Sequence, residues 1–157
     1  MIRQRILFVC TGNICRSPTA EGVARALATR RGLADAFDFD SAGTHGYHVG
    51  EAPDPRTVAA ARKRGYDLSS LRARRVTDFD FVAFDQLLAM DCSHLEIMTR
   101  ASPPAHRHKL KLFLDYAIRF DAAEVPDPYY GGPQGFDHVL DLVEDAADGL
   151  LDKLRQK

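Results

Sequence analysis

A four-residue apolar run, Ile6-Leu7-Phe8-Val9, stands near the start of the chain and leads into the loop sequence Cys10-Thr-Gly-Asn-Ile-Cys-Arg-Ser17. A continuous apolar run of this length is typical of a strand buried on both faces of a parallel sheet. Pro18 favours the first turn of a helix, which we expect to continue to about Arg30 with Ser17 as its N-cap. The chain therefore opens with a predicted strand, loop and helix.

Strand and helix patterns alternate along the rest of the chain. They predict elements at residues 37–41 (strand), 55–64 (helix), 86–90 (strand), 93–100 (helix) and 109–113 (strand). Apolar residues at helical spacing from Phe136 to Leu154 predict a long last helix, in which Gly149 is slightly unfavourable. This order predicts a single α/β domain over residues 1–157 with a parallel sheet.

The composition is that of an ordinary globular protein. The chain has 157 residues and a formal net charge of -1, which does not favour a nucleic-acid-binding surface. No apolar run is long enough for membrane insertion, and the segment after Met1 is unlike a signal peptide. Three cysteines without framework spacing favour free thiols in a reducing cytoplasm.

The loop over residues 10–17 has the composition of an anion site. It lies at the carboxyl end of a predicted strand, where ligands bind in such sheets. Its backbone N–H groups and the following helix N-terminus favour a phosphate, and Arg16 can bind two phosphate oxygens. The Gly-Lys-Ser or Gly-Lys-Thr of nucleotide-hydrolase P-loops does not follow Gly12.

Cys10 begins this loop and is a candidate nucleophile. A thiol among N–H donors, a helix N-terminus and Arg16 is favoured as the reactive thiolate, and Ser17 is placed to hydrogen-bond it. A cysteine on its own is more often a packed side chain, but the spacing to Arg16 and Ser17 favours chemistry. A zinc site from Cys10 and Cys15 is disfavoured, because the gap does not match a zinc hairpin.

A phosphate ester also needs an acid for its leaving oxygen. The sequence offers Val125-Pro-Asp-Pro-Tyr-Tyr130, in which Asp127 stands between two prolines and beside two tyrosines. An aspartate between prolines is also common in simple turns. Asp127 is therefore a candidate general acid, but the segment around it does not distinguish a catalytic aspartate from one in a simple turn.

Taken together, these segments resemble the low-molecular-weight protein tyrosine phosphatases over essentially the whole chain. The order of the motifs is specific, because the nucleophile comes first and the acid far downstream, the reverse of the large tyrosine phosphatases. The matching segments are Cys10–Pro18, Ser41–Thr44, Gly50–Arg56, Met90-Asp91 and Asp127–Tyr130. The resemblance implies a three-layer α/β fold, with a four-stranded parallel sheet flanked by helices and the phosphate loop between strand one and helix one.

The resemblance also implies a function, the hydrolysis of phosphotyrosine in proteins without metal or other cofactor. Cys10 would form a cysteinyl-phosphate, Arg16 would stabilise the transferring group, and Asp127 would act as acid and then as base. The resemblance implies two further groups of residues, those that bind the phosphate and those that support the loop. The phosphate-binding residues are Thr11, Gly12, Asn13, Ile14, Cys15, Arg16 and Ser17, with Asn13, Ser17 and Ser41 supporting the loop.

Two positions depart from the family pattern. Leu71 stands where a histidine often braces the loop, so a different or weaker bracing network is expected. Tyr47 stands at the cleft wall where tryptophan is frequent, and we expect Tyr47, Tyr129 and Tyr130 to flank a phosphoaryl group.

The remaining chemical residues are interpreted as follows. Cys15 is either a packed side chain or a redox partner that captures oxidised Cys10 as a disulfide. His45 and His48 are expected near the cleft, but as surface loop residues without clear partners. Arg72, Arg74 and Arg75 are expected to form a solvated basic face, although they could also attract acidic phosphopeptides. The His106-Arg107-His108 tract resembles a metal site only superficially, and Cys92 is interpreted as a core or helix-start residue.

Two rival functions remain open. A thiol-dependent arsenate reductase can share this fold and loop, but its disulfide relay needs a further resolving thiol, and Cys92 has no neighbouring cysteine. A non-catalytic phosphate-binding adaptor is the other rival, disfavoured by the joint presence of Cys10, Arg16 and Asp127. The sequence does not identify the phosphoprotein substrate or an oligomeric state.

Overall fold

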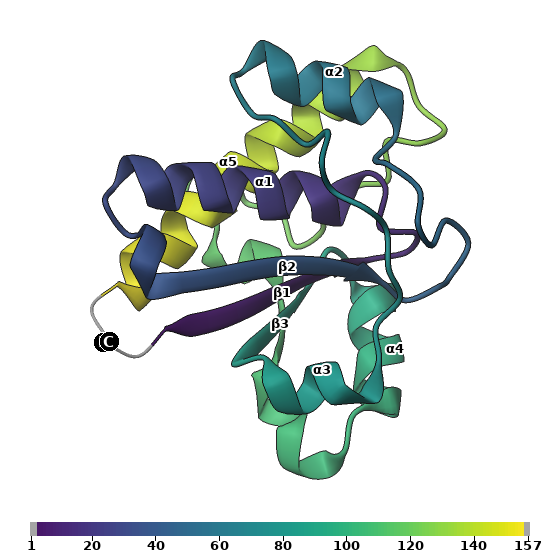
Figure 1. The fold of residues 1–157 in the computed structure, drawn as a ribbon, viewed down its shortest axis with the longest axis vertical. Coiled ribbons are helices and arrows are strands. Elements are labelled where there is room, and N and C mark those ends of the chain that lie inside the picture. The colour runs from purple at the N-terminus through teal and green to yellow at the C-terminus, as the bar shows by residue number, and fades with distance from the viewer. Residues whose placement is uncertain (1–2, 156–157) are drawn as a thin grey trace.

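The computed structural model describes residues 3–155 and contains a four-stranded sheet (Figure 1). All neighbouring strands are parallel, in the order β2-β1-β3-β4. The strands are β1 (Gln4–Cys10), β2 (Phe37–Gly43), β3 (Gln86–Ala89) and β4 (Leu110–Leu112). The fourth strand is shorter than predicted, because a 3-10 turn begins at Phe113. Met1, at the start of the segment judged unlike a signal peptide, lies outside the described residues.

β1 is central and buried on both faces, as its apolar run predicts. Ile6, Phe8 and Cys10 belong to one core cluster, whereas Leu7 and Val9 belong to a second one. Because successive side chains of a strand point to opposite faces, a run without polar interruptions fills both clusters at once.

Helices cover both faces of the sheet and make a three-layer α/β fold (Figure 1). Three helices lie on the first face, namely α1 (Arg16–Arg30), α2 (Pro55–Lys63) and α5 (Pro133–Leu154), with α2 packed on α5. The second face is covered by α3 (Asp78–Ala83) and α4 (Cys92–Ala101), through Phe81 and Met98. The predicted four-stranded architecture is confirmed.

The start of α1 differs from the prediction, and one short helix was not predicted. α1 begins at Arg16, with Cys15 at the N-cap position, so Ser17 is not the cap. The Ser17 hydroxyl instead lies 3.0 Å from the Cys10 sulfur. The helix that was not predicted is α3, which has six residues and begins with a capping box between Thr77 and Asp80.

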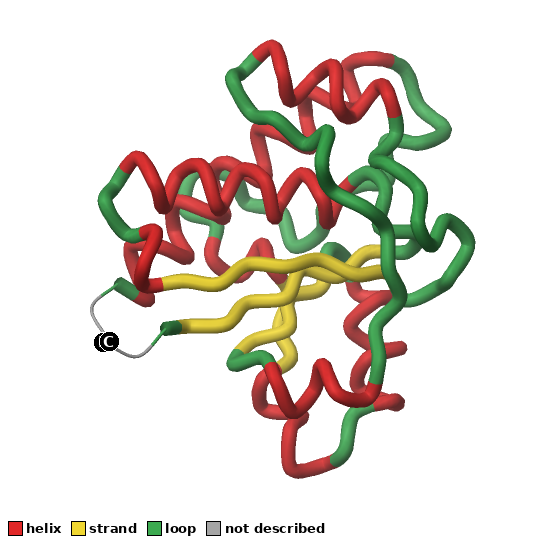
Figure 2. The backbone as a smooth tube through the Cα atoms, in the orientation of Figure 1, coloured by secondary structure: helices red, strands yellow, loops and turns green. Residues whose placement is uncertain are grey.

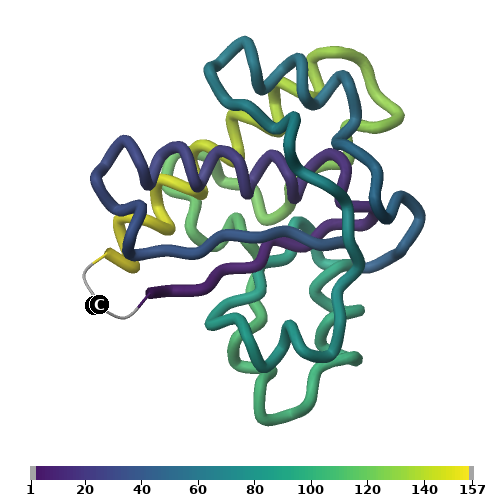
Figure 3. Tube along the Cα trace, viewed as in Figure 1, coloured from purple at the N-terminus to yellow at the C-terminus, as the bar shows by residue number. Residues whose placement is uncertain are grey.

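The strand order places a crevice beyond the ends of β1 and β3. The chain passes from β1 to β2 on one side of the sheet centre and then returns to β3 on the other. In a parallel sheet such a switch point, outside the carboxyl ends of the strands, is where ligands bind. Loops gather at this end of the sheet (Figure 2), whereas the start of β1 and the end of α5 lie at the opposite end (Figure 3).

Gly149 is required by packing rather than slightly unfavourable. It is buried in α5 where the 3-10 turn Phe113–Tyr116 crosses the helix. A Cβ atom at this position would lie 1.8 Å from the carbonyl oxygen of Tyr116, far inside contact distance. Only a residue without a side chain allows the two backbones to approach this closely.

Gly149→Ala should therefore lower the free energy of unfolding by about 1–3 kcal/mol, the usual cost of overpacking. Gly135→Ala is the matched control in the same helix, because its Cβ would meet Pro128 at an ordinary 3.6 Å. The control should gain about 0.5–1 kcal/mol from better helix propensity. Equal changes in the two variants, measured by urea unfolding, would show that close packing at Gly149 is not the constraint.

Candidate active site

A cavity of about 180 Å³ lies at the carboxyl end of β1. It brings together Cys10 and Arg16 from the loop after β1 with Asp127 from a segment more than a hundred residues downstream. The lining residues are Cys10, Thr11, Gly12, Ile14, Cys15, Arg16, Tyr47, His48, Asp127, Tyr129 and Tyr130. All three candidate catalytic residues and all three candidate wall tyrosines therefore face one cavity.

The carbonyl oxygens of the loop are held by the segments around it. The hydrogen bonds are Thr44 N to Cys10 O (2.8 Å), His45 N to Thr11 O (3.0 Å), Asp54 N to Ile14 O (2.9 Å) and Thr19 N to Cys15 O (3.3 Å). A trans peptide holds its N–H opposite its C=O. The N–H groups that follow these carbonyls are therefore directed to the other side, the concave side that an anion would occupy.

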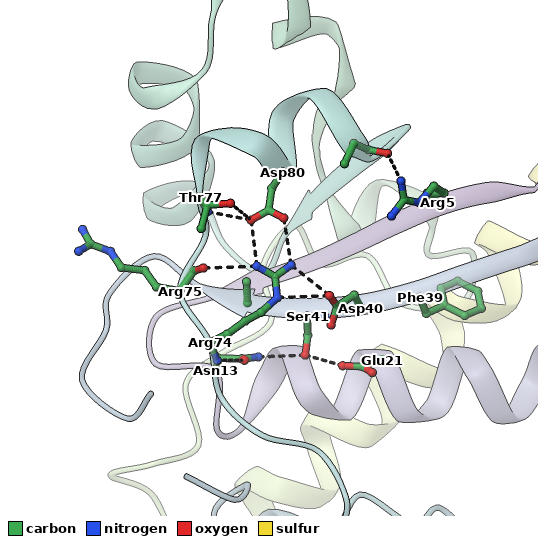
Figure 4. Close-up of polar contacts among 12 residues, drawn as sticks. Arg5, Asn13, Glu21, Phe39, Asp40, Ser41, Arg74, Arg75, Thr77 and Asp80 are labelled. Carbon is green, nitrogen blue, oxygen red and sulfur yellow. Dashed lines mark hydrogen bonds and ion pairs between the residues drawn. The ribbon is translucent and has the colours of Figure 1, made fainter. Parts of the chain in front are cut away.

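Asn13 is the conformational centre of the loop. Its φ of 59° is left-handed, a region that asparagine tolerates better than most residues. Its amide nitrogen donates to the hydroxyls of Ser17 (2.7 Å) and Ser41 (3.0 Å). The Ser41 hydroxyl in turn donates to Glu21 Oε1 at 2.6 Å (Figure 4). The predicted support residues Asn13, Ser17 and Ser41 thus form one buried chain, and Glu21, which sequence reasoning missed, ends it.

Cys10 lies at the floor of the cavity and is only 3% exposed. Its sulfur is 3.0 Å from the Ser17 hydroxyl, which itself accepts from Asn13. The Ser17 hydroxyl has two acceptors within reach for its single hydrogen, the Cys10 sulfur and, at 3.4 Å, the Ala42 carbonyl oxygen. The Cys10 sulfur is therefore held within hydrogen-bond distance of a hydroxyl that belongs to a buried polar network.

Arg16 is buried and oriented by groups behind the loop. Its Nη1 donates to Asp91 Oδ2 (2.8 Å) and to the Val125 carbonyl (3.1 Å), and Nη2 donates to Thr11 Oγ1 (3.3 Å). Burial works to raise the pKa of Asp91, but hydrogen bonds from Ser93 and Arg16 and the nearby His94 hold it below its ordinary value. An ionised Asp91 therefore fixes the guanidinium plane at neutral pH.

Asp127 stands at the mouth of the cavity. Its side chain is 43% exposed, and Oδ2 lies 3.7 Å from Arg16 Nη2. The other oxygen accepts a hydrogen bond from the Tyr129 amide at 3.0 Å, which curls the segment and aims the carboxyl group toward the loop. The candidate acid and the candidate nucleophile thus line the same cavity, and the candidate acid lies next to Arg16.

Aromatic groups form the walls above this floor. Tyr47 stacks on His45 at a centroid distance of 5.0 Å, and Tyr129 packs against Tyr130 at 4.9 Å. The guanidinium of Arg56 lies over the Tyr129 ring at 5.2 Å and is paired with Asp54 at 2.9 Å. A flat aromatic group fits between such walls.

The expectation that His45 and His48 have no clear partners was wrong. His48 lines the cavity, pairs with Glu51 at 3.2 Å and packs so tightly that a Cβ at Gly12 would lie 2.9 Å from its ring. The Nδ1 atom of His45 lies 2.8 Å from Thr44 Oγ1. Both residues are therefore partnered, and His48 belongs to the site.

His94 is a further buried residue that sequence reasoning missed. Its Nε2 lies 2.7 Å from Thr11 Oγ1, and Nδ1 lies 3.1 Å from Asp91 Oδ1 without the alignment of a hydrogen bond. Burial, followed by the nearby Arg16 cation, lowers the pKa of His94 to about 4. His94 is thus neutral at physiological pH, so the positive charge on this side of the loop is that of Arg16. A lone histidine three residues after a strand-end aspartate gave no distinctive signal.

The other chemical residues are placed as follows. Burial raises the pKa of Cys15 to about 12. Cys92 is exposed at the start of α4, which agrees with its interpretation as a helix-start residue. Within residues 3–155, no cluster of three or more histidine, cysteine or acidic side chains is arranged to hold a metal ion. None of the helices in that range is both long and apolar enough to cross a membrane.

Residues 5–157 match the model of the family described as low molecular weight phosphotyrosine protein phosphatase. The chain belongs to this family. It is 44% identical to the low molecular weight protein-tyrosine-phosphatase of Streptomyces coelicolor, over 98% of this chain and 94% of the relative. It is 36% identical to the low molecular weight phosphotyrosine protein phosphatase of Sus scrofa, over 98% of both chains.

A solved structure agrees with these relatives. The protein tyrosine phosphatase of Entamoeba histolytica, crystallised with Hepes in its active site, superposes with a TM-score of 0.95 at 39% identity. The match covers 98% of this chain and 97% of that one. The fold expected from the resemblance is thus confirmed over nearly the full length of both chains.

Proposed function

We propose that the protein hydrolyses phosphotyrosine in proteins, with Cys10 as nucleophile, Arg16 as anion ligand and Asp127 as general acid and base. The observation that carries this proposal is the meeting of these three side chains in one cavity of about 180 Å³. Membership of a phosphotyrosine phosphatase family supports the reaction class. We further propose that residues 1–157 act as a single catalytic domain in the cytoplasm, which the three free thiols support.

The reaction proceeds in two displacements at phosphorus. The Cys10 thiolate attacks, an S–P bond forms and the P–O bond to the phenol breaks, while Asp127 gives its proton to the leaving oxygen. In the second step water attacks phosphorus and gives a proton to the Asp127 carboxylate. The S–P bond breaks, and phosphate leaves with the thiolate restored.

Transition-state stabilisation comes from the residues that bind the phosphate, Thr11, Gly12, Asn13, Ile14, Cys15, Arg16 and Ser17. Loop N–H groups and the Arg16 fork face the position where charge develops, and they are held there before substrate arrives. The ion pair of Arg16 with Asp91, at 2.8 Å, removes the need to order the arginine during the reaction. Ser17 stabilises the sulfur as it leaves.

The aromatic walls set the substrate class. A phosphorylated tyrosine is long enough to reach the buried sulfur between Tyr47 and Tyr129, where its ring is in contact with theirs. A phosphoserine side chain is shorter and lacks a ring. Phosphotyrosine-containing proteins are therefore the proposed partners.

The pure protein should hydrolyse aryl phosphates and phosphotyrosine peptides without added metal or thiol, and Cys10→Ser should abolish turnover. Because Arg16 and the loop N–H groups do not depend on sulfur, the variant should still bind inorganic phosphate. Steady-state kinetics and phosphate titration measure the two properties. Arsenate reduction that requires added thiol would favour the arsenate reductase. Phosphate binding without turnover by the parent would favour the non-catalytic adaptor.

Asp127→Asn should slow kcat/KM most for substrates with poor leaving groups, by about a hundredfold to ten-thousandfold. A phenol of low pKa leaves as its anion and needs the proton less. The measurement is kcat/KM across aryl phosphates of increasing phenol pKa, for the parent and the variant. The same dependence on leaving-group pKa in both proteins would assign proton donation to another residue.

Cys15 is proposed as the redox partner of Cys10. Peroxide converts the Cys10 thiolate to a sulfenic acid, and attack by the Cys15 sulfur forms a disulfide and releases water. The parent should therefore regain activity with a thiol reductant after peroxide, whereas Cys15→Ser should recover far less. Since burial raises the pKa of Cys15 to about 12, capture should accelerate with increasing pH. Mass spectrometry that finds only sulfinic or sulfonic Cys10 in the parent would refute this role.

A further inference from the structure

Arg74 lies at the centre of a charged cluster next to the phosphate loop (Figure 4). Its guanidinium donates to both oxygens of Asp80 at 3.0 Å and twice to Asp40 Oδ2, at 3.1 and 3.2 Å. A fifth bond reaches the Arg75 carbonyl at 3.3 Å. A guanidinium has five N–H groups, so every donor of Arg74 is used.

The expectation that Arg74 belongs to a solvated basic face was therefore wrong. Its side chain is 33% exposed, and the Asp80 carboxylate that it pairs with is only 6% exposed. Burial works to lower the pKa of Arg74, but Asp80 and Asp40 raise it above the ordinary value. With two carboxylates in contact, this cation is not available to attract an acidic peptide.

The main chain of Arg74 contacts the phosphate loop directly. Its N–H donates to Asn13 Oδ1 at 3.0 Å, and its carbonyl accepts from Gly43 N at 2.8 Å. This residue therefore lies between the end of β2 and the one loop residue with a left-handed backbone. Leu71, which stands where the family often has a bracing histidine, packs against the core.

The cluster connects this contact to two rigid elements. Asp40 is part of β2, whereas Asp80 is part of α3 and also accepts hydrogen bonds from the backbone N–H (2.8 Å) and the hydroxyl (3.3 Å) of Thr77. A fork with all its donors used has one orientation relative to two carboxylates. The position of the Arg74 amide is thus fixed by groups that do not themselves line the cavity.

We propose that Arg74 is a positioning residue for the phosphate loop. The Asp40–Arg74–Asp80 cluster holds the Arg74 amide against Asn13, and so keeps the Asn13 side chain aligned with Ser17 and Ser41. The cluster takes the place of the histidine brace. The predicted effect on turnover rests on the proposed function. The predicted effect on the conformation of the loop does not, because the loop has that conformation in the protein without substrate.

The test compares Arg74→Met with Arg31→Met. Arg31 is a matched control: its side chain is 27% exposed and bridges Asp148 and Asp152, both at 2.7 Å, at the end of α1 away from the loop. Both variants should lower Tm. Only Arg74→Met should raise the inhibition constant of inorganic phosphate, slow iodoacetamide alkylation of Cys10 at pH 6, and reduce kcat/KM, each by about tenfold. Arg74→Lys should restore little, because an ammonium cannot reproduce the planar set of four hydrogen bonds to three carboxylate oxygens of Asp80 and Asp40.

A milder variant keeps the test decisive if Arg74→Met does not fold. Asp40 is 45% exposed at its side chain, and Asp40→Asn retains an oxygen for the Ser41 amide while it removes the acceptor that the guanidinium uses. Like Arg74→Met, this variant should raise the inhibition constant of phosphate and slow the alkylation of Cys10. Parent-like values in Asp40→Asn, or equal effects of Arg74→Met and Arg31→Met on phosphate and alkylation, would overturn the proposal. Absence of turnover by the parent would instead defeat the proposed function, since phosphate binding and alkylation remain measurable.

Discussion

The left-handed backbone of Asn13 is the constraint on which the rest of the site depends. With φ at 59° the chain turns sharply between the end of β1 and the start of α1. Such a conformation is unfavourable for most residues, and here it is stabilised by amide contacts to Ser17, Ser41 and the Arg74 backbone. The turn lets the loop carbonyls bond outward and leaves its N–H groups on the concave side.

The sheet supplies the partners that this loop needs. β1 lies between β2 and β3, so the carboxyl ends of both neighbours flank the loop. The end of β2 contributes Ser41, and the segment after β3 contributes Asp91 and His94. Arg16 is thus ordered by the carboxylate of Asp91, which follows the neighbouring strand β3. The central position of the most apolar strand is therefore also what assembles the polar site.

Local rules were sufficient for the parts of the structure that local physics decides. The apolar run of β1, the proline at the start of α1 and the apolar stripe of α5 each predict their element, whereas the anion site that the loop composition predicts stays a prediction. Gly149 and His94 were beyond such rules, because each depends on a contact across the fold. Arg74 was misinterpreted for the same reason: its carboxylate partners include one 34 residues away in the sequence. Side chains that act through distant partners have no local signature.

The division between a main-chain floor and side-chain walls has a consequence for inhibitor design. Substitutions at the rim leave the loop amide N–H groups and Arg16 in place, so an anionic head group that binds only the proposed anion site meets a surface that rim substitutions hardly alter. The rim is different, because Tyr47 is 69% exposed and His48 lies beside it. Selectivity between related proteins has to come from contacts with these wall residues. Resistance to an inhibitor would arise more readily at the exposed Tyr47 than at His48, whose ring packs against Gly12 of the loop.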